Sequence, residues 1–378
     1  MFEASPTVTI CGRKPKLALF LPSLLAGGAE TVMLTLAGGF ADRGVDVDLV
    51  LARSEGPLLT RVPAQVRVVD LQARRVLTSA PNLVRYLRRE RPDAVLSTLG
   101  HANIIALLAG RLCGLSTRIV IREATTPSAT TEQSKRLTSK FFPTLARLLY
   151  PRSAAVVAVS HGVAEDLIGV YGLPRERIHV IYNPVNIHEL QSKAEESTDH
   201  PWFAAGKPPV LLGVGRLTAA KDYVTLIRAF SLVRQQRNVR LVIAGEGEER
   251  SRLETLIKEL DLVADVDLPG FIQNPISLMA RARIFILSSN REGLPNALIQ
   301  AMFVGTPLIS TDCLSGPREI LQGVQNSRLV PVGNATTLAK AIFSFLDNDI
   351  TATTPPAAGR FASETVINSY LKLLMGED

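Results

Sequence analysis

The stretch SSNREGLPNALIQAM, residues 288–302, follows the apolar run Ile284–Leu287, which predicts a short buried strand. Glu292 and Gly293 then predict a turn. Pro295 favours the first position of a helix, because the N–H that proline lacks would have no partner there. The stretch is therefore expected to form a strand, a turn and a helix, with Glu292 beside the first amides of the helix.

The start of this helix is a candidate anion site, because free amides and the positive end of the helix dipole attract negative charge. The donors would be the amides of Gly293, Leu294 and Asn296. A phosphate bound there would repel Glu292, so we expect Glu292 to accept hydrogen bonds from neutral hydroxyls, such as those of a sugar. A helix capped by a charged loop is the alternative on these residues alone.

The same stretch resembles the E-x7-E signature of the retaining nucleotide-sugar glycosyltransferases of family 4, which are two-domain enzymes of the GT-B type. In that family the first glutamate contacts the donor sugar, and the second contacts the ribose of the nucleotide. Here Glu292 stands at the first position and Gln300 at the second. An amide oxygen can still accept a hydrogen bond from a ribose hydroxyl, but without the charge assistance of a carboxylate.

A second charged motif follows the predicted strand Val210–Val214, where Gly215, Arg216 and Lys221 precede a predicted helix over residues 222–234. An arginine and a lysine at the end of a strand, near a helix start, suit a diphosphate. Their spacing resembles the family's G-R-x4-K motif, whose cations bind the donor phosphates and stabilise the departing nucleotide diphosphate. The resemblance also places Phe271 against the nucleotide base, with core packing as the alternative.

In the first half, Gly27 and Gly28 lie in the sequence AGGAE, between a predicted strand and a predicted helix. Paired glycines let a backbone approach a ligand closely, or they allow a turn with positive φ. The loop resembles the family's G-G-A-E loop, which faces the donor diphosphate across the interdomain cleft. By the same resemblance His101 is presented to the donor sugar, although a lone histidine is also compatible with a structural role.

Apolar strand patterns alternate with helical ones along the chain, which indicates parallel sheets covered on both faces, with ligands beyond the carboxyl ends of the strands. Arg122 and Glu123 end one such strand, where the family often has polar residues on the acceptor side; a salt-bridged loop is the alternative. Strands are expected at residues 16–21, 45–51, 66–69, 94–97, 119–121, 155–159, 178–181, 210–214, 239–244, 266–268, 284–287 and 307–310.

This pattern and the resemblance predict an α/β protein with two Rossmann-like domains whose parallel sheets face a central cleft, the GT-B fold. The polar, proline-containing stretch 188–208 has the composition of a linker. We therefore expect a flexible N-terminus at residues 1–15, an acceptor-side domain at 16–187, and a nucleotide-sugar-binding domain at 209–357. A C-terminal helix within 358–378 is expected to cross back to the first domain.

The net charge of +7 is divided unevenly. Residues 1–190 contain 23 Lys and Arg against 15 Asp and Glu, whereas residues 191–378 contain 19 against 20. Such asymmetry suggests that the first half faces something anionic. Arginines and lysines lie beside aromatic residues in segments 81–92 and 134–152, which suits shallow insertion at an anionic membrane surface and equally suits solvated helices packed on a sheet.

Several other kinds of site lack their sequence patterns. The three cysteines are scattered, so neither a disulfide framework nor a zinc site is expected, and a reducing cytoplasm fits. Two D-x-D sequences, at 46–48 and 265–267, fall inside alternating strand patterns, so we expect no metal and no cofactor. No apolar run reaches the ~18 residues of a membrane span, and residues 1–15 lack the apolar core of a secretory signal.

The expected activity is metal-independent transfer of a hexose, with retention, from a nucleotide diphosphate sugar. By resemblance the donor is UDP-linked and the acceptor is a lipid-linked or surface glycan in bacterial polysaccharide or lipopolysaccharide biosynthesis. No nucleic acid partner is expected, and the location is the cytoplasm, with contact to the inner face of the membrane. Two alternatives stay open: a GT-B nucleotide-sugar epimerase, and a non-enzymatic basic protein that binds membrane or RNA.

Overall fold

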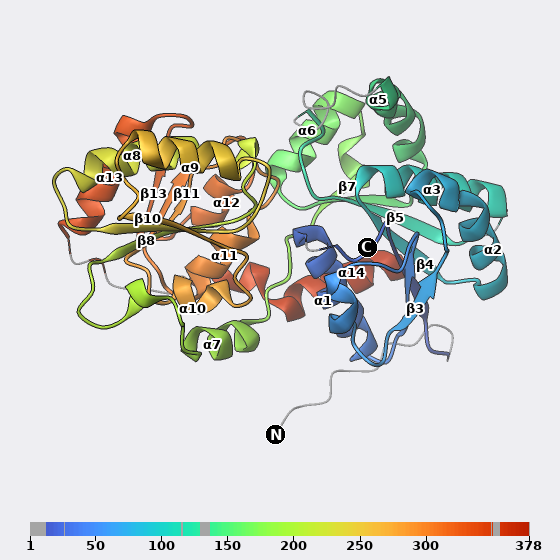
Figure 1. Cartoon of the computed structure of the whole chain (residues 1–378). Helices are drawn as coiled ribbons and strands as arrows, with labels where there is room; N and C mark the ends of the chain where they lie inside the picture. Colours follow the sequence, from blue (N-terminus) through green and yellow to red (C-terminus); the bar gives the residue numbers. More distant parts are fainter. Residues whose placement is uncertain are drawn as a thin grey trace. The chain divides into compact units, whose positions relative to one another are not determined.

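The computed structural model describes residues 13–25, 27–114, 116–128, 137–348, 350 and 356–377. The chain forms two compact units (Figure 1). One contains the residues up to Pro184 and those from Phe361 onward, and the other is Val185–Arg360. Each unit contains a sheet whose strands pair in parallel, so the predicted α/β class with two parallel sheets is confirmed.

The first unit has a seven-stranded sheet in the order β3-β2-β1-β4-β5-β6-β7 within the described residues. The predicted strands lie within a residue or two of the observed ones, because uninterrupted runs of Val, Ile, Leu and Ala can be buried on both faces of a parallel sheet. The strands are β1 (Lys16–Leu21), β2 (Asp46–Leu51), β3 (Arg67–Asp70), β4 (Ala94–Thr98), β5 (Arg118–Glu123), β6 (Ala155–Ala158) and β7 (Ile178–Val180).

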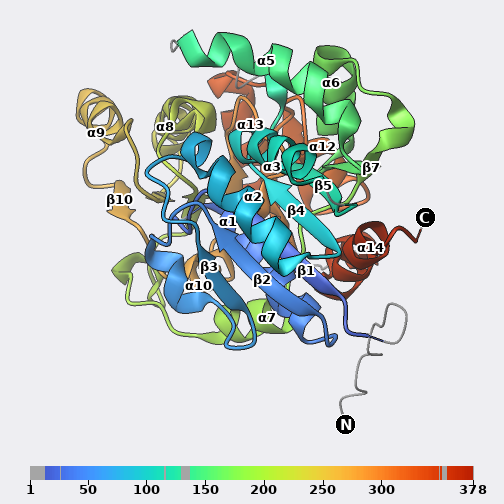
Figure 2. The ribbon, with the colours of Figure 1, turned by 90° about the vertical axis from the view of Figure 1, so that its right-hand side faces the viewer.

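Most helices of the first unit lie between consecutive strands of this sheet, whereas α14 follows the second unit in sequence. Figure 2 shows α2 in front of the strands. The helices are α1 (Gly28–Ala41), α2 (Ala80–Glu90), α3 (Gly100–Cys113), α5 (Leu137–Leu149), α6 (His161–Tyr171) and α14 (Ser363–Met375), with short 3-10 turns η1 (Pro57–Arg61), η2 (Val76–Ser79), η3 (Tyr150–Arg152) and η4 (Arg175–Arg177). The 3-10 turn η7 (Pro356–Phe361) spans the border at which the chain returns from the second unit.

One face of the first sheet is covered by α1 and α14. Leu17, Leu19 and Leu21 alternate along β1 and belong to one buried cluster with side chains of both helices, including Phe40 and Tyr370. The alternation follows from the two-residue repeat of a strand, which sends every second side chain to the same face. The final helix of the chain therefore completes the core of the first unit, although it follows the whole second unit in sequence.

The second unit has a six-stranded sheet in the order β10-β9-β8-β11-β12-β13 within the described residues. Its strands are β8 (Val210–Val214), β9 (Arg240–Ala244), β10 (Val266–Gly270), β11 (Ile284–Leu287), β12 (Leu308–Thr311) and β13 (Ser327–Val330). Its helices are α7 (Ile187–Glu195), α8 (Tyr223–Arg234), α9 (Arg250–Glu259), α10 (Pro275–Met279), α11 (Asn296–Phe303), α12 (Pro317–Leu321) and α13 (Ala335–Leu346), with 3-10 turns η5 (Pro201–Phe203) and η6 (Ala219–Lys221).

The stretch 188–208, whose composition is that of a linker, is instead mostly ordered structure within the second unit. Asn186 caps α7 by accepting a hydrogen bond from the amide of Glu189 at 3.2 Å, and Leu190 is buried. Farther on, Arg240 lies over the ring of Trp202, 4.6 Å from its centroid. The border between the units falls after Pro184. Residues 1–12 of the expected N-terminal segment and 134–136 of the basic segment lie outside the described residues.

Both strand orders contain a point at which consecutive strands go to opposite sides. In the first sheet this point lies between β1 and β4, and in the second between β8 and β11. The loops that follow the two strands at such a point diverge and leave room for a ligand at the carboxyl edge of the sheet. Gly27 and His101 follow β1 and β4, and Lys221 and Glu292 follow β8 and β11. No helix in the described ranges has the length and hydrophobicity needed to cross a membrane.

A charged cluster fastens α2 to the edge of the first sheet. Lys16 and Arg67 both pair with Glu90. Arg67 also binds Asp48 (2.5 Å), whose carboxylate accepts a hydrogen bond from Tyr86 at 2.6 Å. The hydrogen bonds from Lys16 and then Arg67 lower the pKa of Glu90 to about 2. For Asp48, burial alone would raise the pKa, but Arg67 and Tyr86 outweigh it and lower it.

We expect this cluster to stabilise the fold at neutral pH and to lose that effect in acid. The folded-state pKa of Glu90 is below its ordinary value of 4.5, so its contribution is complete above pH 4.5 and disappears as the pH falls toward 2. Glu90→Gln should therefore lower the free energy of unfolding at pH 7 and leave it nearly unchanged near pH 2. Urea unfolding across this range tests the expectation, with Asp46→Asn, an exposed acid of the same sheet, as control; a constant difference at all pH values would contradict it.

Candidate functional site

The second unit brings its two charged motifs together at the carboxyl edge of its sheet. The loop after β8 carries Arg216 and Lys221, and the loop after β11 carries Glu292. These loops are neighbours because β8 and β11 pair directly, with Leu211 opposite Ile284 and Leu212 opposite Phe285. Strand pairing thus places Lys221 beside Glu292, although the two residues lie far apart in sequence.

Hydrogen bonds fix the two loops to each other. The hydroxyl of Ser288 donates to the carbonyl oxygen of Lys221 at 2.7 Å. The backbone N–H of Asn290 donates to the carbonyl of Ala220 at 2.9 Å, and its side-chain amide donates to the carbonyl of Ala219 at 3.0 Å. Three consecutive carbonyl groups of one loop are therefore held by the other, which sets the position from which the Lys221 side chain extends.

Glu292 is held at one of its two carboxylate oxygens. Its Oε1 accepts hydrogen bonds from Lys221 Nζ at 2.5 Å and from the hydroxyl of Ser289 at 2.6 Å. The side chains of Lys221 and Glu292 are 21% and 12% exposed, so the pair is largely shielded from water but not enclosed. The described residues contribute no hydrogen bond to Oε2, which leaves this oxygen able to accept from a ligand hydroxyl.

The charge of Glu292 affects two buried neighbours. Burial and then the Glu292 carboxylate raise the pKa of Cys313 to about 12, and the same two causes raise the pKa of Tyr223. Cys313 is buried and free, and its raised pKa favours the neutral thiol over the nucleophilic thiolate. The interior beside Glu292 therefore contains neutral groups, and Lys221 supplies the balancing positive charge.

The loop that carries Arg216 rests directly on the loop after β9. The amide of Leu217 donates to the carbonyl of Glu246 at 2.8 Å. A Cβ atom added at Gly247 would lie 2.2 Å from the carbonyl oxygen of Leu217, and one added at Gly245 would lie 2.0 Å from that of Gly215. The G-E-G sequence after β9 therefore allows two backbones to approach closely, and Arg216 is exposed above this contact.

The helix after Glu292 starts one residue later than predicted: Pro295 is the N-cap residue, and α11 begins at Asn296. Gly293 and Leu294 form the turn and are buried. Gly316 lies against this turn in a left-handed conformation, with φ of 90°.

Gln300, the residue at the second position of the E-x7-E pattern, is half-buried on α11. Phe271 follows β10 with 73% of its surface exposed, so the alternative of core packing is wrong. Its ring is available to an external partner.

The predicted site residues of the first unit lie at its own switch point. Gly27 is the N-cap of α1 and Gly28 is its first residue, and His101 is in the first turn of α3, where its ring packs edge-on against Phe142. The φ of Gly27 is −144°, so a turn with positive φ does not explain this glycine. A Cβ atom there would meet only the end of the flexible Glu30 side chain.

The two D-x-D sequences form ion pairs or contacts within the protein. Asp48 binds Arg67, and Asp265 pairs with Arg234 at 2.9 Å. Asp267 lies 2.9 Å from the ring nitrogen Nε2 of His200. Among the described residues no group of three or more His, Cys, Asp or Glu side chains is arranged to hold a metal ion.

Ser289, Asn290 and Gly247 contribute to the site without a distinctive signal in the sequence. Ser289 and Asn290 are part of the quoted stretch, but a serine or an asparagine after a strand is typical of any loop. The glycines after β9 form only part of the G-x-G-x-x-G pattern of a dinucleotide-binding turn, because Arg250 stands at its last position. These glycines let the loop that carries Arg216 approach closely, because β9 is adjacent to β8. The local sequence does not show which strands are adjacent.

Two family models match most of the chain. The family described as Glycosyltransferase Family 4 matches residues 26–189, and the family described as Glycosyl transferases group 1 matches residues 195–360. The first range covers most of the part of the first unit that ends at Pro184, and the second covers nearly all of the second unit, Val185–Arg360.

Relatives extend over nearly the full chain. The Campylobacter jejuni N-acetylgalactosamine-N,N'-diacetylbacillosaminyl-diphospho-undecaprenol 4-alpha-N-acetylgalactosaminyltransferase is 32% identical over 346 residues, 88% of this chain and 91% of that protein. The lipopolysaccharide core biosynthesis glycosyltransferase LpsE of Rhizobium meliloti is 27% identical over 361 residues, 92% and 96% of the two chains.

Among solved structures, Anabaena Alr3699/HepE in complex with UDP has a TM-score of 0.77 at 22% identity, covering 96% of this chain and 100% of that one. The apo lipopolysaccharide outer core galactosyltransferase WaaB has a TM-score of 0.71 at 20% identity, with 96% and 100% coverage. These likenesses show the fold. The two family matches and the relative that is 32% identical over 88% of this chain establish that the chain is a glycosyltransferase of family 4, and its fold is GT-B.

Proposed function

We propose that the protein transfers a hexose, with retention of configuration, from a nucleotide diphosphate sugar to a lipid-linked or surface glycan. The observation that carries the proposal is the Lys221–Glu292 pair, 2.5 Å apart at the switch point of the second sheet. It combines a cation for phosphate with a carboxylate that has one oxygen left for a sugar hydroxyl. A site that binds only an anion would not require the carboxylate of Glu292 at this position.

The sugar-binding role falls to Glu292. Because Lys221 and Ser289 both donate to its Oε1, the carboxylate is oriented before any ligand arrives, and Oε2 accepts from the donor sugar. A carboxylate held in this way is a weak nucleophile, so the acceptor hydroxyl attacks on the face from which the leaving group departs. The bond to the acceptor oxygen forms and the bond to the phosphate oxygen breaks on the same side of the sugar, and the proton of the acceptor hydroxyl passes to the departing phosphate oxygen.

The leaving nucleotide diphosphate takes up negative charge as its bond to the sugar breaks. Arg216 and Lys221 supply positive charge, and the amides of Gly293, Leu294 and Asn296 at the start of α11 supply hydrogen-bond donors. Gly215 lets the phosphate approach the loop backbone. These groups replace the neutralising effect of a metal ion, so the proposed reaction is metal-independent.

Other residues complete the donor site in the proposal. The exposed ring of Phe271 stacks on the base, and Gln300 on α11 accepts from the ribose. In the first unit Gly27 and Gly28 approach the diphosphate, and His101 contacts the sugar. The solved structures that share this fold include complexes with UDP and with UDP-glucose, which supports a uridine donor.

The names of two relatives support the proposed class of acceptor. The Campylobacter jejuni protein is named as a 4-alpha-N-acetylgalactosaminyltransferase that acts on a sugar linked to diphospho-undecaprenol. The Rhizobium meliloti protein is named for lipopolysaccharide core biosynthesis. We infer a glycan acceptor on a lipid, with the enzyme in the cytoplasm at the inner face of the membrane.

A panel of nucleotide sugars, each incubated with and without a lipid-linked acceptor and analysed by mass spectrometry, tests the function. We expect one donor to be consumed only when the acceptor is present. Because the configuration is retained, an alpha-linked donor should give an alpha-linked product. Because the reaction is proposed to be metal-independent, it should proceed in the presence of EDTA. An altered free sugar nucleotide formed without acceptor would instead show an epimerase. No turnover and no binding of any donor would reject the proposal.

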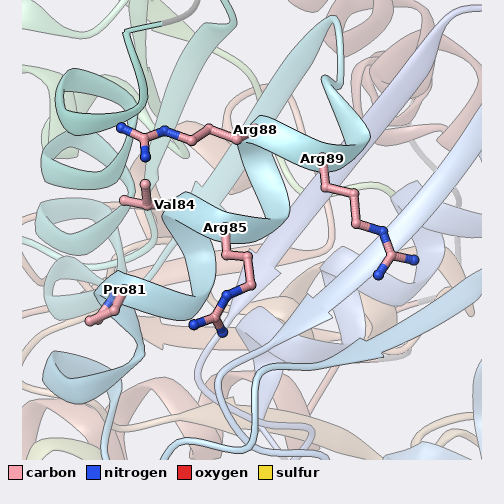
Figure 3. Close-up of a pocket in the computed structure, with 5 residues that line it drawn as sticks. All are labelled: Pro81, Val84, Arg85, Arg88 and Arg89. Atoms are coloured by element: carbon pink, nitrogen blue, oxygen red, sulfur yellow. The ribbon is translucent and has the colours of Figure 1, made fainter.

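Membrane contact is proposed through the basic face of α2. Arg85, Arg88 and Arg89 line an open hollow of about 470 Å³, with Arg85 and Arg89 pointing to one side of the helix and Arg88 to another (Figure 3). Leu77 and Leu112, on neighbouring elements η2 and α3, are 56% and 62% exposed. Guanidinium groups beside exposed leucines suit an anionic lipid surface, each basic residue contributing ~1 kcal/mol.

Vesicle flotation tests this contact. Replacing Arg85, Arg88 and Arg89 by glutamine should weaken binding to phosphatidylglycerol vesicles by more than tenfold and leave donor binding unchanged. The matched control is the same change at three exposed arginines of the second unit, Arg228, Arg252 and Arg328, which removes equal charge. Equal loss in both triple variants would show a nonspecific charge effect and contradict a defined surface.

A further inference from the structure

Arg122, at the end of β5, is completely buried and is the largest fully buried side chain among the described residues. Its guanidinium donates three hydrogen bonds: Nε to the hydroxyl of Tyr370 at 3.1 Å, Nη1 to that of Thr98 at 3.1 Å, and Nη2 to the Oδ1 of Asn183 at 2.5 Å. A planar guanidinium can satisfy three directed partners only if all three are fixed in place.

The three partners come from distant parts of the chain. Asn183 belongs to the segment in which the chain leaves the first unit, since Pro184 is the last residue of that unit before the second begins. Tyr370 is on α14, the segment by which the chain returns. Thr98 ends β4, directly before the turn that leads to His101. One side chain therefore binds the outgoing segment, the returning segment and the base of the His101 turn.

A second contact joins the outgoing and returning segments. The rings of Tyr182 and Phe361 lie 4.9 Å apart, and Phe361 is the first residue of the returning segment and fully buried. The two places at which the chain passes between its units are thus packed together inside the first unit. Arg122 is linked to this contact because it binds Asn183, the residue that follows Tyr182.

Burial of the Arg122 charge needs an explanation. None of its three hydrogen-bond partners is charged, and the adjacent carboxylate of Glu123 is itself held by Tyr150 and Asn103. Apolar side chains of similar volume in place of Arg122 and its partners would give the protein similar stability, because burying the guanidinium removes it from water at a cost. A polar network in which each of the three guanidinium nitrogens has a partner instead specifies one geometry, since a displacement breaks at least one of these buried hydrogen bonds.

We propose that Arg122 is a positioning residue that holds both chain crossings, and with them the His101 turn, in one fixed arrangement. Its loss would leave the donor site of the second unit intact but would loosen the base on which the two units are joined. The proposed function uses residues of both units, whereas the proposed phosphate contacts lie mainly in the second. The turnover part of this inference rests on the proposed function; the part that concerns the crossings does not.

The test measures hydrogen–deuterium exchange, donor affinity and turnover in the full chain. Arg122→Met should raise amide exchange at least tenfold in peptides that cover residues 181–185 and 363–375. It should change the donor Kd less than threefold and lower kcat at least tenfold. Arg122→Lys keeps the charge but not the fork, so it should restore stability in part and leave exchange at 181–185 high.

Arg118→Met is the matched control. Arg118 donates from Nε to the carbonyl of Leu373 at 2.9 Å, so it contacts α14 but not the outgoing segment. Exchange at 181–185 should remain at the wild-type level in this variant. If Arg122→Met does not fold, Tyr370→Phe and Asn183→Ala each remove one partner and should raise exchange in both crossings.

Unchanged exchange at 181–185 in folded Arg122 or Asn183 variants would overturn the inference. So would a rise spread evenly over the whole first unit, since that would show a general structural role. Wild-type protein that turns over no donor would reject the proposed function, while the exchange results would still decide whether Arg122 holds the crossings.

Discussion

Glu292→Gln should lower the rate of sugar transfer by about a hundred- to a thousandfold, the size of effect seen when one preorganised group is removed from a polar transition state. The amide keeps the shape of the side chain but loses the charge that Lys221 and Ser289 hold in place. Lys221→Met should give a loss of similar size, because it removes positive charge from the leaving diphosphate. Initial rates at saturating donor measure both.

The double variant separates catalysis from folding. Each single change leaves one half-buried charge without its partner, so each should lower the free energy of unfolding. Lys221→Met combined with Glu292→Gln leaves neither charge, and it should recover much of the stability while remaining inactive. A loss of activity that recovers together with stability would contradict a direct role in the reaction.

The control for this pair is Lys193→Met on α7. Lys193 and Glu189 form an ion pair of the same length, 2.5 Å, with side chains 34% and 46% exposed. Exposed pairs of this kind contribute little to stability, typically below ~1 kcal/mol. Both activity and the free energy of unfolding should stay close to those of the unchanged protein.

Gly247→Ala should weaken donor binding by about tenfold or more and lower the free energy of unfolding by ~1–3 kcal/mol. The added Cβ would lie 2.2 Å from the carbonyl oxygen and 2.7 Å from the carbonyl carbon of Leu217, so the two loops must separate. That movement displaces Arg216, which immediately precedes Leu217. Titration calorimetry with the donor and urea unfolding measure the two effects.

Gly169→Ala is the matched control for this change. Gly169 is on α6 of the first unit, and a Cβ atom there would meet nothing within 4 Å. Alanine is favoured over glycine inside a helix by up to about 1 kcal/mol, so this variant should be at least as stable as the original. Normal donor affinity in Gly247→Ala would show that the loop after β9 does not position Arg216.

Some elements were predictable because their signal is local. The apolar runs Lys16–Leu21, Val210–Val214 and Ile284–Leu287 correspond to β1, β8 and β11 at both ends, and the helix expected within 358–378 is α14, Ser363–Met375. A buried parallel strand requires a short uninterrupted apolar run, and an amphipathic helix requires a repeat of 3.6 residues. β13 was missed because Ser327–Val330 is short and carries Ser and Arg.

Composition misled at residues 188–208, where polar residues and prolines suggested a linker. α7 forms there because Asn186 caps it and because other parts of the second unit hold it: Asn274 donates from its side-chain amide to the carbonyl of Lys193 at 2.9 Å. Such partners lie some eighty residues away in sequence, so local composition carries no trace of them.

The amino-acid sequence by itself determined the α/β class, most of the strands, and the charged residues that we propose for a phosphorylated sugar: Arg216, Lys221 and Glu292. Only the tertiary structure decided that β8 pairs with β11, that Lys221 therefore holds Glu292 with help from Ser289, and that Arg122 binds both chain crossings. The physical reason is that strand order and buried hydrogen bonds join residues distant in the chain, whereas periodicity and turn chemistry act between neighbours.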